Sequence, residues 1–190
     1  MLYTKNSPHI LCLTEDNLQY SELALSHIEN YTLGTHYRRN KKTHGRCLLY
    51  TKNIPFTCLE IGDYCKNQDI EIRGIQLNYD YDKLCILAVY RSPLGQLPNQ
   101  FGFSFTKNFL FKFTFIICGD ININYLDDSY KKKQLYSISY SFNICSIVNF
   151  PTRIGPSSLS TIDNVFIDNS YLNKYIAPVI NGLSIMTHNY

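Results

Sequence analysis

The segment at residues 115–124, FIICGDININ, carries the side chains of this chain that are best suited to do chemistry. Asp120 and Asn122 follow an apolar run and a glycine, with one residue between them. A carboxylate can take a proton from water or hold a hard cation, and an amide can donate to a phosphoryl oxygen. If extended geometry continues, both side chains lie on one face at the carboxyl end of a strand. A polar turn is the alternative, because Gly, Asp and Asn are ordinary turn residues.

Other polar residues also stand at the ends of apolar runs. Glu15 follows a short apolar run, Tyr90 ends another, and Asp163 lies near the start of a third. Glu15 could instead lie in the first turn of a capped helix, and Tyr90 could be a core residue with its hydroxyl at the rim. If the strands share one sheet edge, these residues would converge with Asp120 and Asn122, as a catalytic cleft requires.

Mostly strands are expected to position these side chains. The patterning predicts strands at residues 9–13, 47–51, 71–77, 84–90, 115–118, 144–148, 160–167 and 175–179, and helices at 18–28, 100–112 and from 131–133 to about 142. The short polar connection at 78–83 predicts an antiparallel hairpin, which argues against a purely parallel sheet. Strands with helices between them favour helices packed outside a β core.

The composition is that of a globular protein. The chain has 190 residues, of which 45% are hydrophobic and 17% charged, so it is expected to form one domain with a real core and not a disordered segment. The net charge of +3 permits a nucleic-acid partner without demanding one.

The densest basic run lies at residues 36–46. It contains Arg38, Arg39, Lys41 and Lys42, which could follow a phosphate backbone. A solvated loop between strands is the alternative, because runs of charge are usually solvated.

Cysteine usage and hydropathy favour an intracellular protein. Seven cysteines without a CxxC pair suit reduced thiols, and most of them lie in apolar runs. No signal peptide is visible at the amino terminus, so secretion is not expected. The longest apolar run, residues 84–90, is far too short to span a bilayer, so no membrane partner is expected.

Five motifs come in an order that resembles a known family. They are LTE at 13–15, VYRSP at 89–93, GDININ at 119–124, PTR at 151–153 and STIDNVF at 160–166. This order is similar to that of the endonuclease/exonuclease/phosphatase superfamily, and most of all to the apurinic-type endonuclease domain of LINE-class, jockey-like non-LTR retrotransposons. The resemblance runs from about residue 10 to residue 184.

The resemblance implies a fold and a reaction. The implied fold is α+β: a four-layer sandwich of two mixed β-sheets flanked by helices, with a cleft along one sheet edge. The implied reaction is phosphodiester cleavage in DNA with Mg²⁺ or Mn²⁺, and the parent element would also carry a reverse transcriptase domain. In-line attack needs an activated water and charge neutralisation on the phosphate oxygens, which these residue types can supply.

The resemblance also implies a role for each matched residue. Glu15 resembles the metal-binding glutamate, and Tyr90 resembles the tyrosine near the scissile phosphate. Asp120 resembles the residue that orients or deprotonates the attacking water, and Asn122 resembles the one that holds the phosphate. The remaining matches are Thr152, which resembles a structural or substrate-contacting threonine, Arg153, which resembles a substrate-contacting residue, and Asp163, which resembles the aspartate that positions a catalytic histidine, here His188.

The chain also departs from the family pattern. The family begins one strand earlier, with an asparagine at that strand's end, and nothing before Pro8 resembles that strand. The family continues with Ser-Asp-His after a Gly-Leu, whereas here Ser184 is followed by Ile-Met-Thr and His188 is displaced by three positions. We therefore expect a single, N-terminally truncated domain spanning 1–190, with little or no activity. The alternatives are a catalytically dead remnant that binds DNA weakly and a hydrolase of small phosphate esters.

Overall fold

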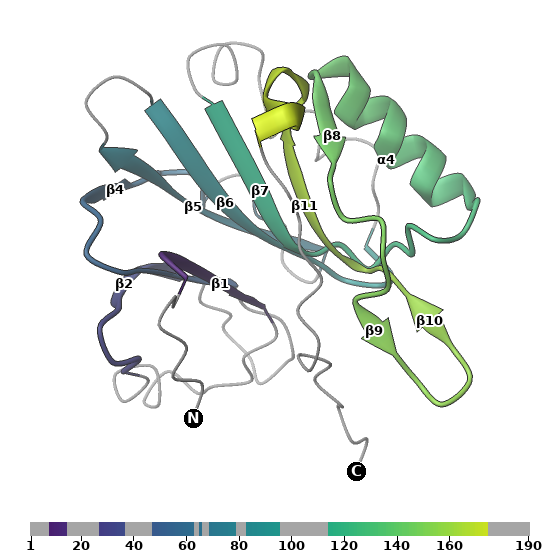
Figure 1. Ribbon diagram of the computed structural model, residues 1–190, viewed down its shortest axis with the longest axis horizontal. Coiled ribbons are helices and arrows are strands. Elements are labelled where there is room, and N and C mark those ends of the chain that lie inside the picture. Colours follow the sequence, from purple (N-terminus) through teal and green to yellow (C-terminus); the bar gives the residue numbers. More distant parts are fainter. Residues whose placement is uncertain are drawn as a thin grey trace.

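The structure is a computed structural model that describes residues 8–14, 27–36, 47–62, 65, 69–78, 83–95 and 114–174. Its centre is a six-stranded sheet with the strand order β4-β5-β6-β7-β11-β8 (Figure 1). The strands are β4 (Phe56–Cys58), β5 (Ile70–Asn78), β6 (Lys83–Arg91), β7 (Thr114–Asp120), β8 (Ile144–Ser146) and β11 (Asp163–Asp168).

The sheet is mixed. Strands β5 and β6 form the predicted antiparallel hairpin, in register from Ile70–Arg91 to Asn78–Lys83. Strands β6 and β7 run parallel, and β11 returns antiparallel to β7. The strand predictions at 47–51, 71–77, 84–90 and 115–118 are confirmed to within three residues at each end.

A second, three-stranded sheet packs on one face of the first. It has the order β1-β3-β2 and is antiparallel, with β1 (Ile10–Thr14), β2 (Thr32–His36) and β3 (Cys47–Thr51). Ile10 and Cys12 of β1 lie against a buried cluster on the large sheet, which consists of Ile75, Leu77, Ile86, Ala88 and Tyr90. Residues two apart on β6 share this face, as strand geometry requires.

Helix α4 (Tyr130–Ser141) packs on the opposite face of the large sheet (Figure 1). Ser129 caps it, accepting a hydrogen bond from the Lys132 N–H at 3.2 Å. Leu135, Ile138 and Phe142, spaced at i, i+3 and i+7, join the main core on this side. The core residues of the sheet that they meet include Ile72, Leu87, Val89, Phe115, Ile117 and Phe166. The helix prediction from 131–133 to about 142 is confirmed.

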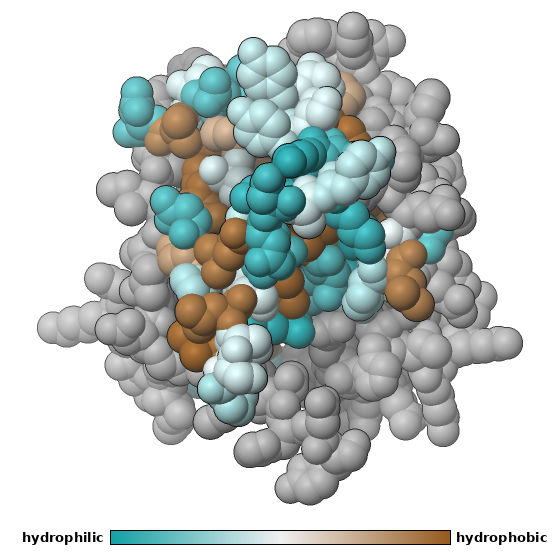
Figure 2. Space-filling model, turned by 90° about the vertical axis from the view of Figure 1, so that its right-hand side faces the viewer, coloured by the Kyte–Doolittle hydropathy of each residue, from teal (hydrophilic) through white to brown (hydrophobic). Residues whose placement is uncertain are grey.

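The outer side of α4 is a solvent face. Tyr130, Tyr136 and Tyr140 are exposed on it, and the rings of Tyr136 and Tyr140 stack at 6.2 Å. In Figure 2, which views the molecule from this side, hydrophilic and intermediate residues interrupt the hydrophobic ones. Among the described residues, no helix is both long and apolar enough to cross a membrane.

Several elements differ from the sequence-based expectation. Residues 160–167 do not form one strand: Ser160 pairs with Arg153 in a small hairpin, β9 (Arg153–Ile154) with β10 (Leu159–Ser160), and β11 begins at Asp163. The strand predicted at 144–148 is shorter: β8 ends at Ser146. Strands β2 and β4 and the hairpin β9–β10 were not predicted, and a short 3₁₀ helix follows β11 at Asn169–Lys174. Most of the predicted helix at 18–28, the helix at 100–112 and the strand at 175–179 lie outside the described residues.

The described cysteines are partly as expected. Six of them, Cys12, Cys58, Cys65, Cys85, Cys118 and Cys145, are free thiols. Of the cysteines in apolar runs, Cys85 is fully buried, whereas Cys12, Cys118 and Cys145 are partly buried.

Candidate active site at the end of strand β7

Four polar side chains form one row across the large sheet. Glu71 of β5 is the register partner of Tyr90 of β6, Tyr90 is the partner of Asp120 of β7, and Asp120 is the partner of Asp163 of β11. Register partners on neighbouring strands project from the same face. That face is the one covered by the three-stranded sheet, since Tyr90 belongs to the cluster beneath β1. The sheet therefore places Tyr90, Asp120 and Asp163 in one row.

The row is largely buried. Glu71 and Asp120 are 0% and 1% exposed, Tyr90 is 4% exposed, and Asp163 is half-buried. A buried carboxylate is costly unless donors surround it, so the contacts of Asp120 decide what this site can do. Glu71 was not singled out from the sequence as a site residue, because an acidic residue in an alternating strand reads as a solvent-facing one.

Asn122 does not continue the strand geometry of β7. The strand ends at Asp120, and Asn122 has a left-handed backbone with φ of 51°. The Asn122 N–H donates to the Asp120 Oδ1 at 2.8 Å, which closes an Asx turn. The expectation that strand spacing aligns the two side chains is wrong, because this local hydrogen bond bends the chain; the turn chemistry weighed as the alternative prevails.

Gly119 is required where the turn begins. Its φ is 141°, a region that L side chains rarely adopt, and a Cβ there would lie 2.0 Å from the Val89 carbonyl oxygen. The absence of a side chain lets β7 approach β6 closely just before Asp120.

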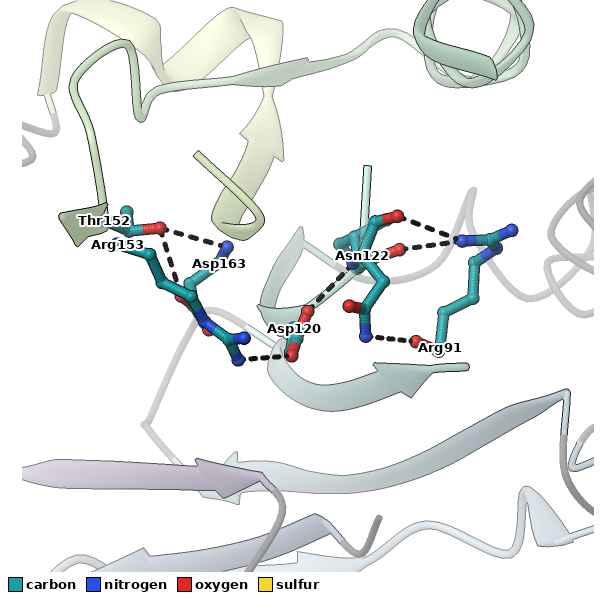
Figure 3. Close-up of polar contacts among 7 residues, drawn as sticks. Arg91, Asp120, Asn122, Thr152, Arg153 and Asp163 are labelled. Atoms are coloured by element: carbon teal, nitrogen blue, oxygen red, sulfur yellow. Dashed lines mark hydrogen bonds and ion pairs between the residues drawn. The ribbon is translucent and has the colours of Figure 1, made fainter. Parts of the chain in front are cut away.

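Arg91, the last residue of β6, holds the turn through hydrogen bonds (Figure 3). Its Nη1 donates to the carbonyl oxygens of Ile121 at 3.1 Å and Asn122 at 3.4 Å, and its Nη2 donates to the Gly95 carbonyl. The Asn122 Nδ2 donates to the Arg91 carbonyl oxygen at 2.7 Å. Burial lowers the pKa of Arg91, while the charges of Asp69 and Asp120 act in the opposite direction. Sequence reasoning used Arg91 only as part of the VYRSP motif; its role as a clamp was missed.

Asn124 ties the same loop to the start of β11. Its Oδ1 accepts the N–H of Thr161 at 2.8 Å and of Leu126 at 3.2 Å. Two backbone hydrogen bonds, from Ile121 N–H to the Ile162 carbonyl and from Tyr125 N–H to the Thr161 carbonyl, run beside it. The repeated asparagines of GDININ were the available signal for this second anchor.

Arg153 forms an ion pair with Asp120. Its Nη2 lies 3.1 Å from the Asp120 Oδ2, and the side chains of Arg153 and Asp120 are 44% and 1% exposed (Figure 3). Both oxygens of the Asp120 carboxylate thus receive a hydrogen bond, one from the turn and one from the guanidinium. These two donors help to offset the cost of burying the Asp120 charge.

Thr152 and Asp163 bind each other reciprocally. The Thr152 hydroxyl donates to the Asp163 Oδ2 at 3.0 Å, and its oxygen accepts the Asp163 N–H at 3.2 Å. The PTR motif therefore sits on the two acidic residues: Thr152 on Asp163 and Arg153 on Asp120. This contact fixes the beginning of the β9–β10 hairpin beside the end of β7.

The other predicted site residues cannot be placed. Glu15, His188, Arg38, Arg39, Lys41 and Lys42 all lie outside the described residues. Within the described part, no group of three or more His, Cys, Asp or Glu residues could hold a metal. The donors at the row are oxygens, which suit Mg²⁺, but Asp120 is engaged by N–H groups. The oxygen donors of the row suit Mg²⁺ in their chemistry, but the described residues do not assemble a metal site.

Comparison with known proteins identifies the fold. No family model and no curated protein match the chain. Among solved structures, the endonuclease domain of TRAS1, a telomere-specific non-LTR retrotransposon, superposes with a TM-score of 0.60 at 11% identity, covering 86% of this chain and 74% of that one. D. rerio TDP2 complexed with a single-strand DNA product gives 0.45 at 14% identity (85% and 71% covered), and truncated Caenorhabditis elegans TDP2 gives 0.49 at 12% (85% and 71%). The chain has the endonuclease/exonuclease/phosphatase fold, and the predicted α/β sandwich is confirmed.

Proposed function

We propose that this chain is a retrotransposon-type endonuclease domain, of the jockey-like LINE class, which binds DNA and hydrolyses phosphodiester bonds slowly or not at all. The observation that carries the proposal is the row of Tyr90, Asp120 and Asp163, with Thr152 and Arg153 bound to its two acidic members. These are the residues that the family motifs assign to the reaction, and they come from four segments distant in sequence. The TRAS1 endonuclease domain supports the proposal through its shared fold.

In this proposal Asp120 is the proton acceptor for the attacking water. Its Oδ1 keeps the hydrogen bond from the Asn122 N–H, so the turn orients the carboxylate. Its Oδ2 is the oxygen that Arg153 contacts, and in this proposal it acts on the attacking water. Asn122 uses one amide hydrogen on the Arg91 carbonyl, and its second amide hydrogen donates to a phosphoryl oxygen. Tyr90, in register with Asp120, places its hydroxyl near the scissile phosphate.

The PTR segment contacts the phosphate in this proposal. Arg153 is half-exposed and presents a planar cation, which suits a phosphodiester. Asp163 orients the imidazole of His188, and Thr152 holds Asp163 for that task. Arg38, Arg39, Lys41 and Lys42 would follow the DNA backbone outside the site.

Mg²⁺ or Mn²⁺ is the cation that we propose for the reaction, with Glu15 as the carboxylate that completes its site. When bound, the cation supplies charge neutralisation on the phosphate oxygens. The roles proposed above for the residues of the row do not depend on the exact position of the cation.

Two features predict slow hydrolysis. Residues 185–188 depart from Ser-Asp-His, and Asp120 is neutralised by Arg153 in the free protein. A missing polar contact in a transition state typically costs about 10²–10³ in rate. The second candidate function, a DNA-binding domain without catalysis, is favoured by the same ion pair, because an aspartate held by two donors is a poor base.

The test is a nicking assay on supercoiled plasmid with Mg²⁺, with Asp120→Ala as the control. Nicking that the variant loses supports the endonuclease. Salt-sensitive DNA retention without nicking supports the binding domain, because phosphate contacts weaken as salt rises. Cleavage of a small phosphate ester with DNA untouched supports a phosphoesterase and overturns the proposal.

The remaining parts of the proposal concern context. We propose that residues 1–190 belong to a single domain, that a reverse transcriptase domain accompanies it in the parent element, and that it works inside the cell. The free thiols of the described cysteines support a reducing compartment.

A further inference from the structure

We propose that Arg153 is a counter-ion that substrate displaces: it neutralises Asp120 in the free protein and moves to the phosphodiester when DNA binds, so that Asp120 is released only in the complex. The inference rests on the proposed function, because it assumes that DNA phosphate enters this site. It adds to the proposed function a sequence of steps, in which DNA binding comes first and release of Asp120 follows.

The two partners differ in their freedom to move. Asp120 is 1% exposed, ends a sheet strand and is held through its Oδ1 by the Asn122 N–H at 2.8 Å. Arg153 is 44% exposed, and its Nη2 reaches Asp120 from the two-residue strand β9. If the pair opens, the guanidinium is therefore the group that moves.

The backbone of Arg153 is fixed beside the site even though its side chain can turn. The Thr152 N–H donates to the Ser160 carbonyl at 2.9 Å, and the Thr152 hydroxyl binds Asp163 at 3.0 Å. Arg153 itself pairs with Ser160 in the hairpin ladder. Because this backbone lies beside Asp120, the Arg153 side chain can change rotamer and still reach a phosphate that binds next to Asp120.

The chemistry of the two anions makes the exchange favourable. Carboxylate and phosphate both accept paired N–H groups from the planar guanidinium, so Arg153 exchanges one partner for another of similar geometry. When the Arg153 guanidinium leaves, the buried Asp120 carboxylate binds a proton more tightly, as a general base must at the moment the substrate arrives. The exchange would thus couple substrate binding to activation of the water.

The test is a double-mutant cycle on DNA binding, measured with the full chain and a fluorescently labelled short duplex in EDTA, so that hydrolysis does not interfere. Arg153→Gln is expected to weaken binding by about 3–10-fold, because one phosphate contact is lost. Asp120→Asn is expected to tighten binding by about 3–10-fold, because the guanidinium no longer has to leave a carboxylate. In the Arg153→Gln background, Asp120→Asn is expected to change the affinity by less than about 2-fold.

A merely local charge effect gives a different result. If Asp120→Asn tightens binding equally with and without Arg153, the carboxylate acts only by repelling phosphate and the exchange is wrong. Asp128→Asn is the matched control, because Asp128 pairs with Lys133 at 3.0 Å on the surface and both side chains are exposed. If the wild-type chain fails to bind the duplex even at low salt, the proposed function and the exchange both fail.

A second measurement does not depend on the folding of the Asp120 variant. The side-chain ¹⁵Nε–¹H signal of Arg153, assigned by its loss in Arg153→Lys, is expected to shift when the duplex is added to the wild-type protein. A signal that stays unchanged at saturating duplex would overturn the exchange, because a guanidinium that keeps its carboxylate partner keeps its environment.

Discussion

Tyr90 and Asp120 are register partners on the parallel strands β6 and β7, although 30 positions separate them in the chain. The parallel pairing places a phenol and a carboxylate side by side at the end of both strands, on the face beneath the three-stranded sheet. Ligand sites in α/β sheets commonly form at the carboxyl ends of parallel strands, where side chains from neighbouring strands converge.

Asp120→Ala should abolish any nicking of supercoiled plasmid. Removal of a proton acceptor reduces the rate of such reactions by about 10²–10⁴-fold, and the nicked fraction after a fixed time measures the loss. Asp128→Ala, on the surface beside Lys133, should leave the rate unchanged. Equal nicking by wild type and Asp120→Ala would remove Asp120 from the reaction.

Gly119→Ala should destabilise the protein. The backbone φ of 141° and a Cβ at 2.0 Å from the Val89 carbonyl oxygen force β7 away from β6, and we expect a loss of about 2–4 kcal/mol in the free energy of unfolding. Urea denaturation followed by circular dichroism measures it. Gly62→Ala is the control, since a Cβ there meets only the flexible end of Arg73 at 3.4 Å, and its cost should stay below about 1 kcal/mol.

Arg91→Met should loosen the turn that carries Asp120. The carbonyl oxygens of Ile121 and Asn122 lose their donor, and the expected cost is about 2–4 kcal/mol of unfolding free energy. Thermal melts measure the stability, and amide hydrogen exchange at Asn122 should accelerate.

The matched control for Arg91 is Arg73→Met. Arg73 is a half-buried arginine of β5 whose Nε donates to the His36 carbonyl at 2.8 Å, and strand β6 lies between β5 and β7. Its replacement should leave exchange at Asn122 unaltered. Equal acceleration in both variants would mean that general destabilisation, and not the clamp, opens the turn.

Thr152→Val removes the hydroxyl of Thr152 while keeping the shape of its side chain. The variant loses both hydrogen bonds to Asp163, with an expected cost of about 1–2 kcal/mol in unfolding free energy, whereas Thr152→Ser keeps the hydroxyl and should recover most of it. Chemical denaturation of the three proteins in parallel gives the comparison. A Thr152→Ser variant as unstable as Thr152→Val would show that the methyl group, and not the hydroxyl, matters.

Stability should fall in alkali. Burial raises the pKa of Cys85 to about 12 from an ordinary value of 9.0, and burial also raises the pKa of Tyr125. Above pH 9 the unfolded chain releases the Cys85 proton while the folded chain keeps it, so the unfolded state gains stability as pH rises. The contribution of Cys85 is complete below pH 9 and is lost progressively toward pH 12, at no more than about 1.4 kcal/mol per pH unit.

Denaturant midpoints between pH 8 and 11 measure this slope. Cys85→Ala lowers the stability at every pH because it leaves a cavity, but its slope with pH should be shallower than that of the wild type. Cys58→Ala, at an exposed thiol, should leave the slope unchanged. A wild-type slope of zero up to pH 11 would contradict the raised pKa.

The sequence predicted the strands well where side-chain periodicity is strong. The hairpin at 71–77 and 84–90 followed from apolar alternation and a short polar connection, and it is antiparallel as expected. The prediction for residues 160–167 was wrong at Ser160, because a hairpin of two residues on each side is too short to leave a periodic pattern. The same limit applies to β4, which has three residues.

At the site, residue types indicated the participants but not their partners. Asp120 and Asp163 were singled out because both stand at the ends of apolar runs, where strands that share a sheet edge would bring them together. Their contacts with Arg153 and Thr152 join segments more than ten positions apart, and no spacing rule encodes such pairs. Asn122 shows the opposite case: its local turn chemistry was readable, and it prevailed over strand geometry.

The sequence by itself determined the long strands with a clear apolar pattern, the helix near 130–142 and which side chains can do acid–base chemistry, because these depend on residue type and on neighbours within a few residues. Only the tertiary structure decided that Glu71, Tyr90, Asp120 and Asp163 share one row and that Arg153 neutralises Asp120. Strand order and register arise from packing two sheets and a helix around common apolar faces. That packing is a property of the whole chain, so the row and its counter-ion exist only once the chain has folded.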